Sequence, residues 1–233
     1  MSNVKPLRIK QPLVETSKLR AVGDVGEFAR TDLPSRGPGR PRGGQVLADR
    51  ARLLAAAETV IRRNGPDVTM EAIAAEATVT KPILYRNIGD KDALVTALAE
   101  RFVDRVNDAA TIALIGATDS RDGLHRLIGS FVDVIEADRN LYLFVTAVGS
   151  STDRFGEALR LADRSALPMA EQLAAQRRAD GLDSKVALTW AYGLIGALHF
   201  ATLWWLRDDS CEASELTNHL SELLWSGLGG RGT

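Results

Sequence analysis

The sequence predicts an all-α fold, in which a small N-terminal three-helix unit is followed by a larger helical body. Three observations support this prediction. Apolar residues recur at steps of three and four from Val46 onward, which is the period of amphipathic helices. Capping residues and glycine or proline stops bound the segments that carry this period. The alternation of apolar and polar residues that marks half-buried strands is absent from the sequence.

The composition is that of an ordinary globular protein, but its charge is unevenly distributed. Of 233 residues, 45% are hydrophobic and 25% are charged, which argues against a disordered or fibrous chain. Residues 1–91 hold 16 Lys and Arg against 10 Asp and Glu, whereas residues 92–233 hold 13 against 20. A basic N-terminal part indicates that this end meets a polyanion, although many charge runs are simply solvated surfaces. Cys211 is the only cysteine, which excludes an internal disulfide, and the N-terminus lacks a signal-peptide pattern, so we expect a cytoplasmic protein.

The chain divides into three parts by composition. Residues 1–44 hold five of the eight prolines and have no sustained apolar period, so we expect a disordered basic arm there. Residues 45–92 carry the three-helix domain, and residues 93–233 carry the larger helical domain.

The three-helix domain begins with an amphipathic helix from Val46, which Asn64-Gly65-Pro66 ends. Thr69 is a natural N-cap for a short helix over 70–77, and Thr80 can cap a third helix over 81–87. Pro82 is tolerated in the first turn of that helix, where its missing N–H has no partner to lose. Gly89 breaks the third helix, and Asp90 caps a long fourth helix over 91–115.

The larger domain shows helical stripes over 124–135, 141–148, 155–173, 186–206 and 216–224, with Pro168 expected to kink or restart the third of these. The segment 186–206 has no Asp, Glu, Lys or Arg, and its length is close to the roughly 20 residues that span a bilayer. It also holds His199 and is followed at once by Arg207. We therefore favour a buried or interface helix over a membrane span.

Two very short helices that meet at a tight turn are what a helix-turn-helix requires. The second of them must present small or polar residues at its N-terminal end to enter the major groove. Thr80, Lys81 and Pro82 occupy this leading edge, and Tyr85 and Arg86 lie where phosphate contacts would fix the register. The alternative is that the threonine is only a cap and that the tyrosine belongs to the core.

The segment from Thr69 to Leu94, TMEAIAAEATVTKPILYRNIGDKDAL, resembles the N-terminal signature of the TetR (tetracycline-repressor-like) family. The resemblance implies a dimeric transcriptional regulator whose C-terminal domain binds a ligand and dimerises, and which leaves its operator when the ligand binds. It also implies that Thr80, Lys81 and Pro82 contact base edges. Phosphate contacts would come from a second set, namely Tyr85, Arg86, Lys91 and Thr69.

The sequence departs from the family pattern at several positions. The family usually has glycine in the turn where this chain has Thr78, and a β-branched residue with positive φ would be strained. Pro66, Asn87 and Ile88 stand where the family usually has an aromatic residue, histidine and phenylalanine. These departures bear on the fine docking geometry.

A second nucleic-acid signal lies in the arm, where residues 36–44 read RGPGRPRGG and resemble an AT-hook. An extended backbone with few side chains fits the minor groove, and Arg36, Arg40 and Arg42 would seek its negative potential. The alternative is a flexible linker with incidental arginines.

The larger domain carries the expected effector site and dimer interface. Aromatic and polar side chains from different helices could line a cavity for an apolar small molecule, and the candidates are Phe102, Phe131, Tyr142, Phe144, Trp190 and His199. For each one, ordinary core packing is the alternative. The stripes Gly193/Ala197/Ala201 and Leu216/Leu220/Leu224 suit packing of the last two helices on a second copy, and two-fold symmetry then requires a palindromic operator.

We therefore expect a repressor that an apolar effector releases from double-stranded operator DNA, with no membrane association. We expect no catalytic residue, metal or cofactor, because the three histidines are far apart in sequence and metalloprotease and phosphate-loop motifs are absent. The alternative is a helical interaction module of the same fold without DNA binding.

Overall fold

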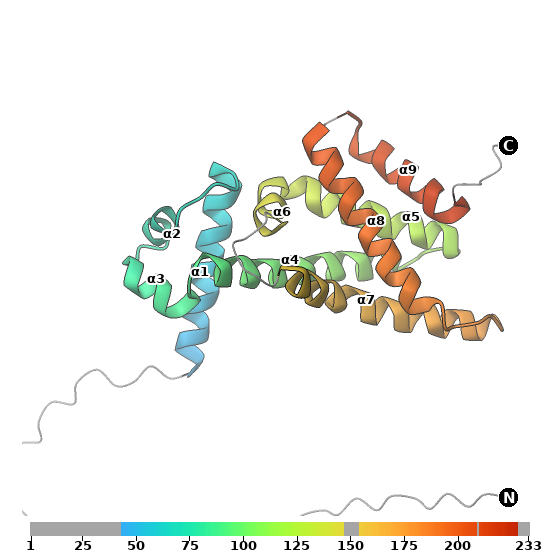
Figure 1. The fold of residues 1–233 in the computed structure, drawn as a ribbon, viewed down its shortest axis with the longest axis horizontal. Coiled ribbons are helices and arrows are strands. Elements are labelled where there is room, and N and C mark those ends of the chain that lie inside the picture. Colours follow the sequence, from blue (N-terminus) through green and yellow to red (C-terminus); the bar gives the residue numbers. More distant parts are fainter. Residues whose placement is uncertain (1–42, 147–153, 209, 228–233) are drawn as a thin grey trace, which may run out of the picture. The chain divides into compact units, whose positions relative to one another are not determined.

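The computed structural model describes residues 43–146, 154–208 and 210–227. These residues contain nine α-helices and no β-strand (Figure 1). The all-α prediction is confirmed. In chain order the helices are α1 (Gly43–Asn64), α2 (Met70–Glu76), α3 (Lys81–Ile88), α4 (Lys91–Leu114), α5 (Ser120–Ala137), α6 (Arg139–Thr146), α7 (Arg154–Ala179), α8 (Ala187–Asp208) and α9 (Ala213–Ser226).

Local sequence signals account for where α2 and α4 begin and for where α3 ends. The Thr69 hydroxyl accepts a hydrogen bond from the Ala72 N–H, and the Asp90 carboxylate accepts one from Ala93. These side chains satisfy backbone donors that have no partner within the helix. Gly89, at φ +101°, ends α3, and its backbone N–H donates to the Tyr85 carbonyl.

The turn between α2 and α3 is unusual because Thr78 has a φ of +56°. It is the only residue other than glycine with positive φ among those described. A β-branched side chain in this region of conformational space is strained. The turn therefore keeps the left-handed geometry that glycine would adopt freely, with threonine in its place.

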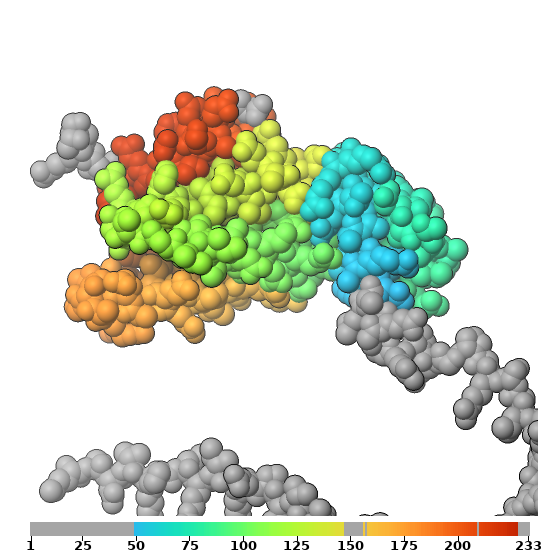
Figure 2. Space-filling view, turned by 180° about the vertical axis from the view of Figure 1, so that it is seen from behind, coloured from blue at the N-terminus to red at the C-terminus, as the bar shows by residue number. Residues whose placement is uncertain are grey.

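The first three helices share their apolar core with α4 and α6. Leu53, Ile61, Ile73 and Leu84 from α1, α2 and α3 are almost fully buried and belong to the same cluster as Phe144 of α6. Residues of α5, α8 and α9 form a second cluster, and alanines of α7 and α8 form a small third one. In Figure 2, α4 and α5 lie between α9 and α7, in agreement with the contacts of α5 with α9 and of α4 with α7.

The uncharged segment 186–206 forms most of α8, with one side buried and another exposed. Across the described ranges, no helix has the combination of length and apolarity that a membrane span requires. Pro168 lies inside α7, which continues through it as one helix, so the expected restart does not occur. The predicted boundary between residues 92 and 93 stays a prediction, and α4 runs across it without a break.

Candidate functional site

The helix α3 presents one buried side and one exposed side. Leu84 and Ile88 anchor it in the core at 0% and 5% exposure. The predicted base-reading and phosphate-contacting residues of this helix all lie on the exposed side, and they are Thr80, Lys81, Pro82, Tyr85 and Arg86. Tyr85 keeps 45% of its surface exposed, although a buried tyrosine was the alternative. The arrangement leaves the N-terminal half of α3 accessible to a major groove.

Two polar contacts hold this helix in place, and sequence reasoning missed both. Lys81 forms an ion pair with Glu71 of α2, in which both side chains are about half exposed. Arg50 of α1 donates through Nη1 to the Asn87 carbonyl at 3.1 Å, at the other end of α3. An acidic residue in the first turn of α2 was visible in the sequence, but its lysine partner depends on the angle between two helices.

The structure brings Thr69 and Lys91 close to one another at the start of α2. The Lys91 ammonium lies 3.4 Å from the carbonyl oxygen of Val68, the residue that precedes Thr69. The Thr69 hydroxyl caps α2 by accepting a hydrogen bond from the Ala72 N–H. The Lys91 ammonium lies beside the backbone that precedes this cap. Arg36, Arg40 and Arg42 of the arm lie outside the described residues.

Three of the predicted effector-site residues meet in one place. Phe102 of α4 and Tyr142 of α6 have ring centroids 5.6 Å apart, and the Tyr142 hydroxyl shares a hydrogen bond of 2.7 Å with Nδ1 of His199 on α8. We call these three residues the aromatic cluster. Burial lowers the pKa of His199 and raises that of Tyr142, so both side chains stay neutral near pH 7.

The other predicted effector-site residues lie elsewhere. Phe144 is buried in the core that includes the first three helices, and Phe131 lies between the first and second clusters. Trp190 is 51% exposed on α8, where the Arg177 guanidinium lies 4.6 Å from its ring, so it does not join the aromatic cluster.

Sequence reasoning missed Thr202, whose hydroxyl is buried without a hydrogen-bond partner within the described part of the chain. A hydroxyl in this state costs stability unless a ligand or water accepts or donates there.

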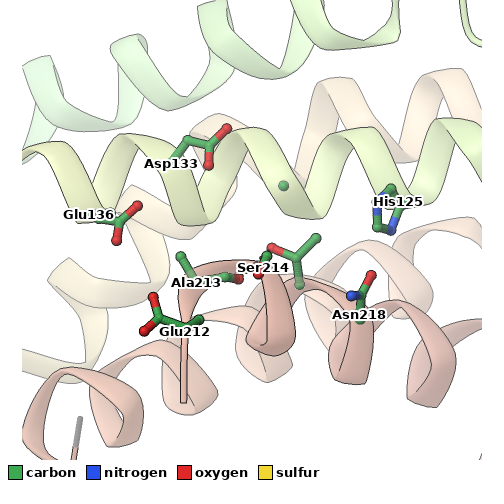
Figure 3. Close-up of a pocket in the computed structure, with 9 residues that line it drawn as sticks. His125, Asp133, Glu136, Glu212, Ala213, Ser214 and Asn218 are labelled. Carbon is green, nitrogen blue, oxygen red and sulfur yellow. Dashed lines mark hydrogen bonds between the residues drawn. The ribbon is translucent and has the colours of Figure 1, made fainter. Parts of the chain in front are cut away.

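Two surface grooves, with volumes of about 410 and 350 Å³, lie beside α9. The carboxylates of Asp133 and Glu136 on α5 and of Glu212 before α9 line the first groove, with His125 and Asn218 farther along it (Figure 3). This lining is polar and acidic. Neither groove includes a predicted effector-site residue, and neither suits an apolar ligand.

The predicted contact stripes for a second copy are partly wrong. Leu216 and Leu220 of α9 are buried at 3% and 5% exposure, and Ala201 packs against the same internal cluster. The outward side of α8 instead carries Phe200 and Trp204, which are 72% and 53% exposed. The amphipathic period predicted an apolar stripe on α8 and on α9. It did not predict whether each stripe would pack inside the same chain or stay exposed for a second copy.

The fold and the exposed leading edge of α3 define a helix-turn-helix protein, the class in which this second short helix enters the major groove of DNA. Residues 53–98 match the family described as bacterial regulatory proteins, tetR family. Residues 109–232 match the tetracyclin repressor-like C-terminal domain. The chain belongs to the TetR family of DNA-binding transcriptional regulators.

Relatives and solved structures agree with this assignment. An uncharacterised HTH-type transcriptional regulator of Mycobacterium tuberculosis is 32% identical over 173 residues, which cover 73% of each chain. The HTH-type transcriptional activator FasR of Mycolicibacterium smegmatis is 27% identical over 195 residues, or 82% of this chain and 88% of FasR. The structure of the transcriptional regulator FadR from Bacillus subtilis in complex with stearoyl-CoA has a TM-score of 0.63 at 16% identity, covering 76% of this chain and 98% of that one. At this identity, the likeness to FadR shows the fold alone.

Proposed function

We propose that this protein is a homodimeric repressor that binds a palindromic operator and is released from it by an apolar small molecule. The exposed leading edge of α3, backed by Leu84 and Ile88 in the core, is the observation that carries the proposal. Thr80, Lys81 and Pro82 read base edges, and Tyr85, Arg86, Lys91 and Thr69 contact phosphates. The arm residues Arg36, Arg40 and Arg42 add a minor-groove contact, as their sequence predicts.

The outward side of α8 supports the dimer. A Cβ atom built on Gly193 or Gly196 would meet no atom within 4 Å, so a second helix can approach the backbone closely at both positions. Phe200 and Trp204 continue this side of the helix at helical spacing and are exposed in the single chain. Exposed aromatic residues of this size are typical of protein interfaces. A two-fold axis through α8 would present two copies of α3 to half-sites about 34–36 Å apart.

The aromatic cluster supports the effector site, because it combines apolar rings with a few polar groups under cover. FadR from Bacillus subtilis was solved with stearoyl-CoA, and we propose a long-chain acyl thioester as the effector class here as well. The acyl chain would contact the Phe102 side of the cluster. Its thioester carbonyl would accept a hydrogen bond from the Thr202 hydroxyl, which is buried and has no hydrogen-bond partner among the described residues.

The DNA-binding part of the proposal is tested by selecting duplexes from a random-sequence pool with the full-length protein. We expect a palindromic consensus, and we expect Lys81→Gln to reduce affinity for it by about 10-fold, which corresponds to ~1.4 kcal/mol. Lys185→Gln makes the same chemical change at an exposed position between α7 and α8, and it should leave the affinity unchanged. Selection of no sequence, at any salt concentration, would favour the alternative of an interaction module without DNA binding.

The effector part is tested by adding stearoyl-CoA to the preformed operator complex, with coenzyme A alone as the control. We expect stearoyl-CoA to raise the operator Kd and coenzyme A to leave it unchanged. A reporter gene placed behind the selected operator then separates repression from activation, which matters because the relative FasR is named an activator. Loss of reporter signal on deleting the regulator would contradict the repressor assignment.

A further inference from the structure

A group of charged side chains lies where α1 meets α4 and the start of α6. Glu58 of α1 is only 5% exposed, and three guanidinium groups surround its carboxylate. Arg62 lies at 3.1 Å, and Arg101 and Arg105 of α4 each lie at 3.2 Å. Asp138, between α5 and α6, accepts from Arg62 at 2.9 Å and lies 3.5 Å from Arg105. We call these five residues the junction cluster.

Arg105 is the member of the junction cluster that also contacts the aromatic cluster. Its Cζ atom lies 5.4 Å from the centre of the Phe102 ring, and that ring lies beside Tyr142. Among the described residues, its buried Nε atom has no hydrogen-bond partner, and its buried Nη2 atom makes no hydrogen bond but lies 3.5 Å from the Asp138 carboxylate. The position of this guanidinium group therefore depends on the ring on one side and on the carboxylates of Glu58 and Asp138 on the other.

Arg101 provides a natural comparison. It reaches the same carboxylate at the same distance, and its other described contact is with the Ala51 carbonyl oxygen at 3.5 Å. Both arginines thus hold α4 to α1 through Glu58. Of this pair, Arg105 alone is described in contact with an aromatic ring, and it alone also lies beside the Asp138 carboxylate.

We propose that Arg105 is a positioning residue through which the state of the aromatic cluster sets the orientation of α1, and with it the affinity of α3 for DNA. A shift of the Phe102 ring moves the guanidinium group and changes its distance from a buried carboxylate, where ionic energies are sensitive to distance. The helix α1 carries α3 with it through the shared core and through the bond from Arg50 to the Asn87 carbonyl. This inference rests on the proposed function, because it assumes that α3 reads DNA.

The inference is tested without any ligand by double-mutant cycles on operator affinity, using a duplex selected by the wild-type protein. Phe102→Leu is combined with Arg105→Met in one cycle and with Arg101→Met in the other. We expect Phe102→Leu to change the operator Kd by about five-fold in the wild-type and Arg101→Met proteins, and by less than about two-fold in Arg105→Met. Glu58 keeps two arginines in either methionine variant, so both are expected to fold.

Circular dichroism melts establish that each variant is folded at the assay temperature, and Tyr142→Phe replaces Phe102→Leu if the latter is not. The inference would be overturned if Phe102→Leu, or Tyr142→Phe in its place, changed the operator Kd equally in the Arg105→Met and Arg101→Met proteins. Coupling seen only with Arg105, together with no response of the wild-type complex to stearoyl-CoA, would support the inference and overturn the effector class of the proposed function. If no duplex is selected at all, the inference and the DNA-binding part of the proposed function are both overturned, because the protein would then have no DNA affinity for Arg105 to change.

Discussion

Replacing Thr78 by glycine is expected to stabilise the protein, which is the reverse of the usual effect of introducing glycine. Thr78 has a φ of +56° in the turn between α2 and α3. A residue with a Cβ atom in the left-handed region costs about 1–2 kcal/mol, and β-branched residues tolerate this region poorly. Glycine adopts the same φ without this penalty.

The net effect is the difference between two opposing contributions. Relief of the strain contributes up to ~2 kcal/mol, and the greater freedom of glycine in the unfolded chain costs about 0.5–1 kcal/mol. We therefore expect Thr78→Gly to raise the free energy of unfolding by ~1 kcal/mol. In a chain of 233 residues, this corresponds to a rise in Tm of about 2–4 °C.

Thermal and urea unfolding at matched protein concentration, without DNA, measure this change. Thr80→Gly is the matched control, because Thr80 lies two residues farther along at an ordinary φ of −79° and its side chain makes no capping bond. The control should be neutral or slightly destabilising. If Thr78→Gly lowers Tm, or shifts it as Thr80→Gly does, the strain at this turn does not limit stability.

Substitutions of Glu71, Trp204 and His199 test three further features of the structure. Glu71→Gln removes the partner of Lys81, so affinity for random-sequence DNA at low salt should rise by about two- to five-fold in a fluorescence anisotropy titration; an unchanged affinity would mean that the ion pair does not compete with phosphates. Trp204→Glu should yield monomers in light scattering, whereas Ile112→Glu, also at an exposed position, should leave the dimer intact; dimers in both would place the interface elsewhere. Burial lowers the pKa of His199, so the unfolded chain takes up a proton more readily than the folded one. The contribution of the neutral imidazole to the free energy of unfolding is therefore complete above about pH 6.5 and is lost as the pH falls below it. Urea unfolding from about pH 7 to pH 5 should therefore show a smaller loss for His199→Gln than for the wild type, and parallel losses would contradict a neutral, buried imidazole.

The parts of the fold that depend on neighbours in sequence were predictable. Thr69 and Asp90 cap the helices that they were expected to cap, because a cap is formed by a side chain and a backbone N–H a few residues away. The exposed side of α3 was predictable for a similar reason, since the spacing of Leu84 and Ile88 assigns the opposite side to solvent.

Contacts between distant helices were not predictable in the same way. Leu216 and Leu220 were expected to face a second copy, and they pack inside the chain. An apolar stripe has the same appearance in sequence whether its own chain or a partner covers it. The junction cluster around Glu58 was missed for a related reason, because its charges come from residues as distant in sequence as Arg62 and Asp138 and converge only when α1, α4 and α6 are packed.

The apolar core that α1, α2 and α3 share with α6 affects how this protein can be recombined with other regulators. A fragment cut after the third helix would leave Leu84 and its neighbours without Leu141 and Phe144, which complete that core. A chimera that joins this sensor to other DNA-binding helices should therefore keep those helices compatible with Leu141 and Phe144, because α6 also carries Tyr142 of the aromatic cluster and belongs with the sensor. An exchange point inside α4 would place residues of this one core on two segments of different origin, and the core would no longer be packed against water.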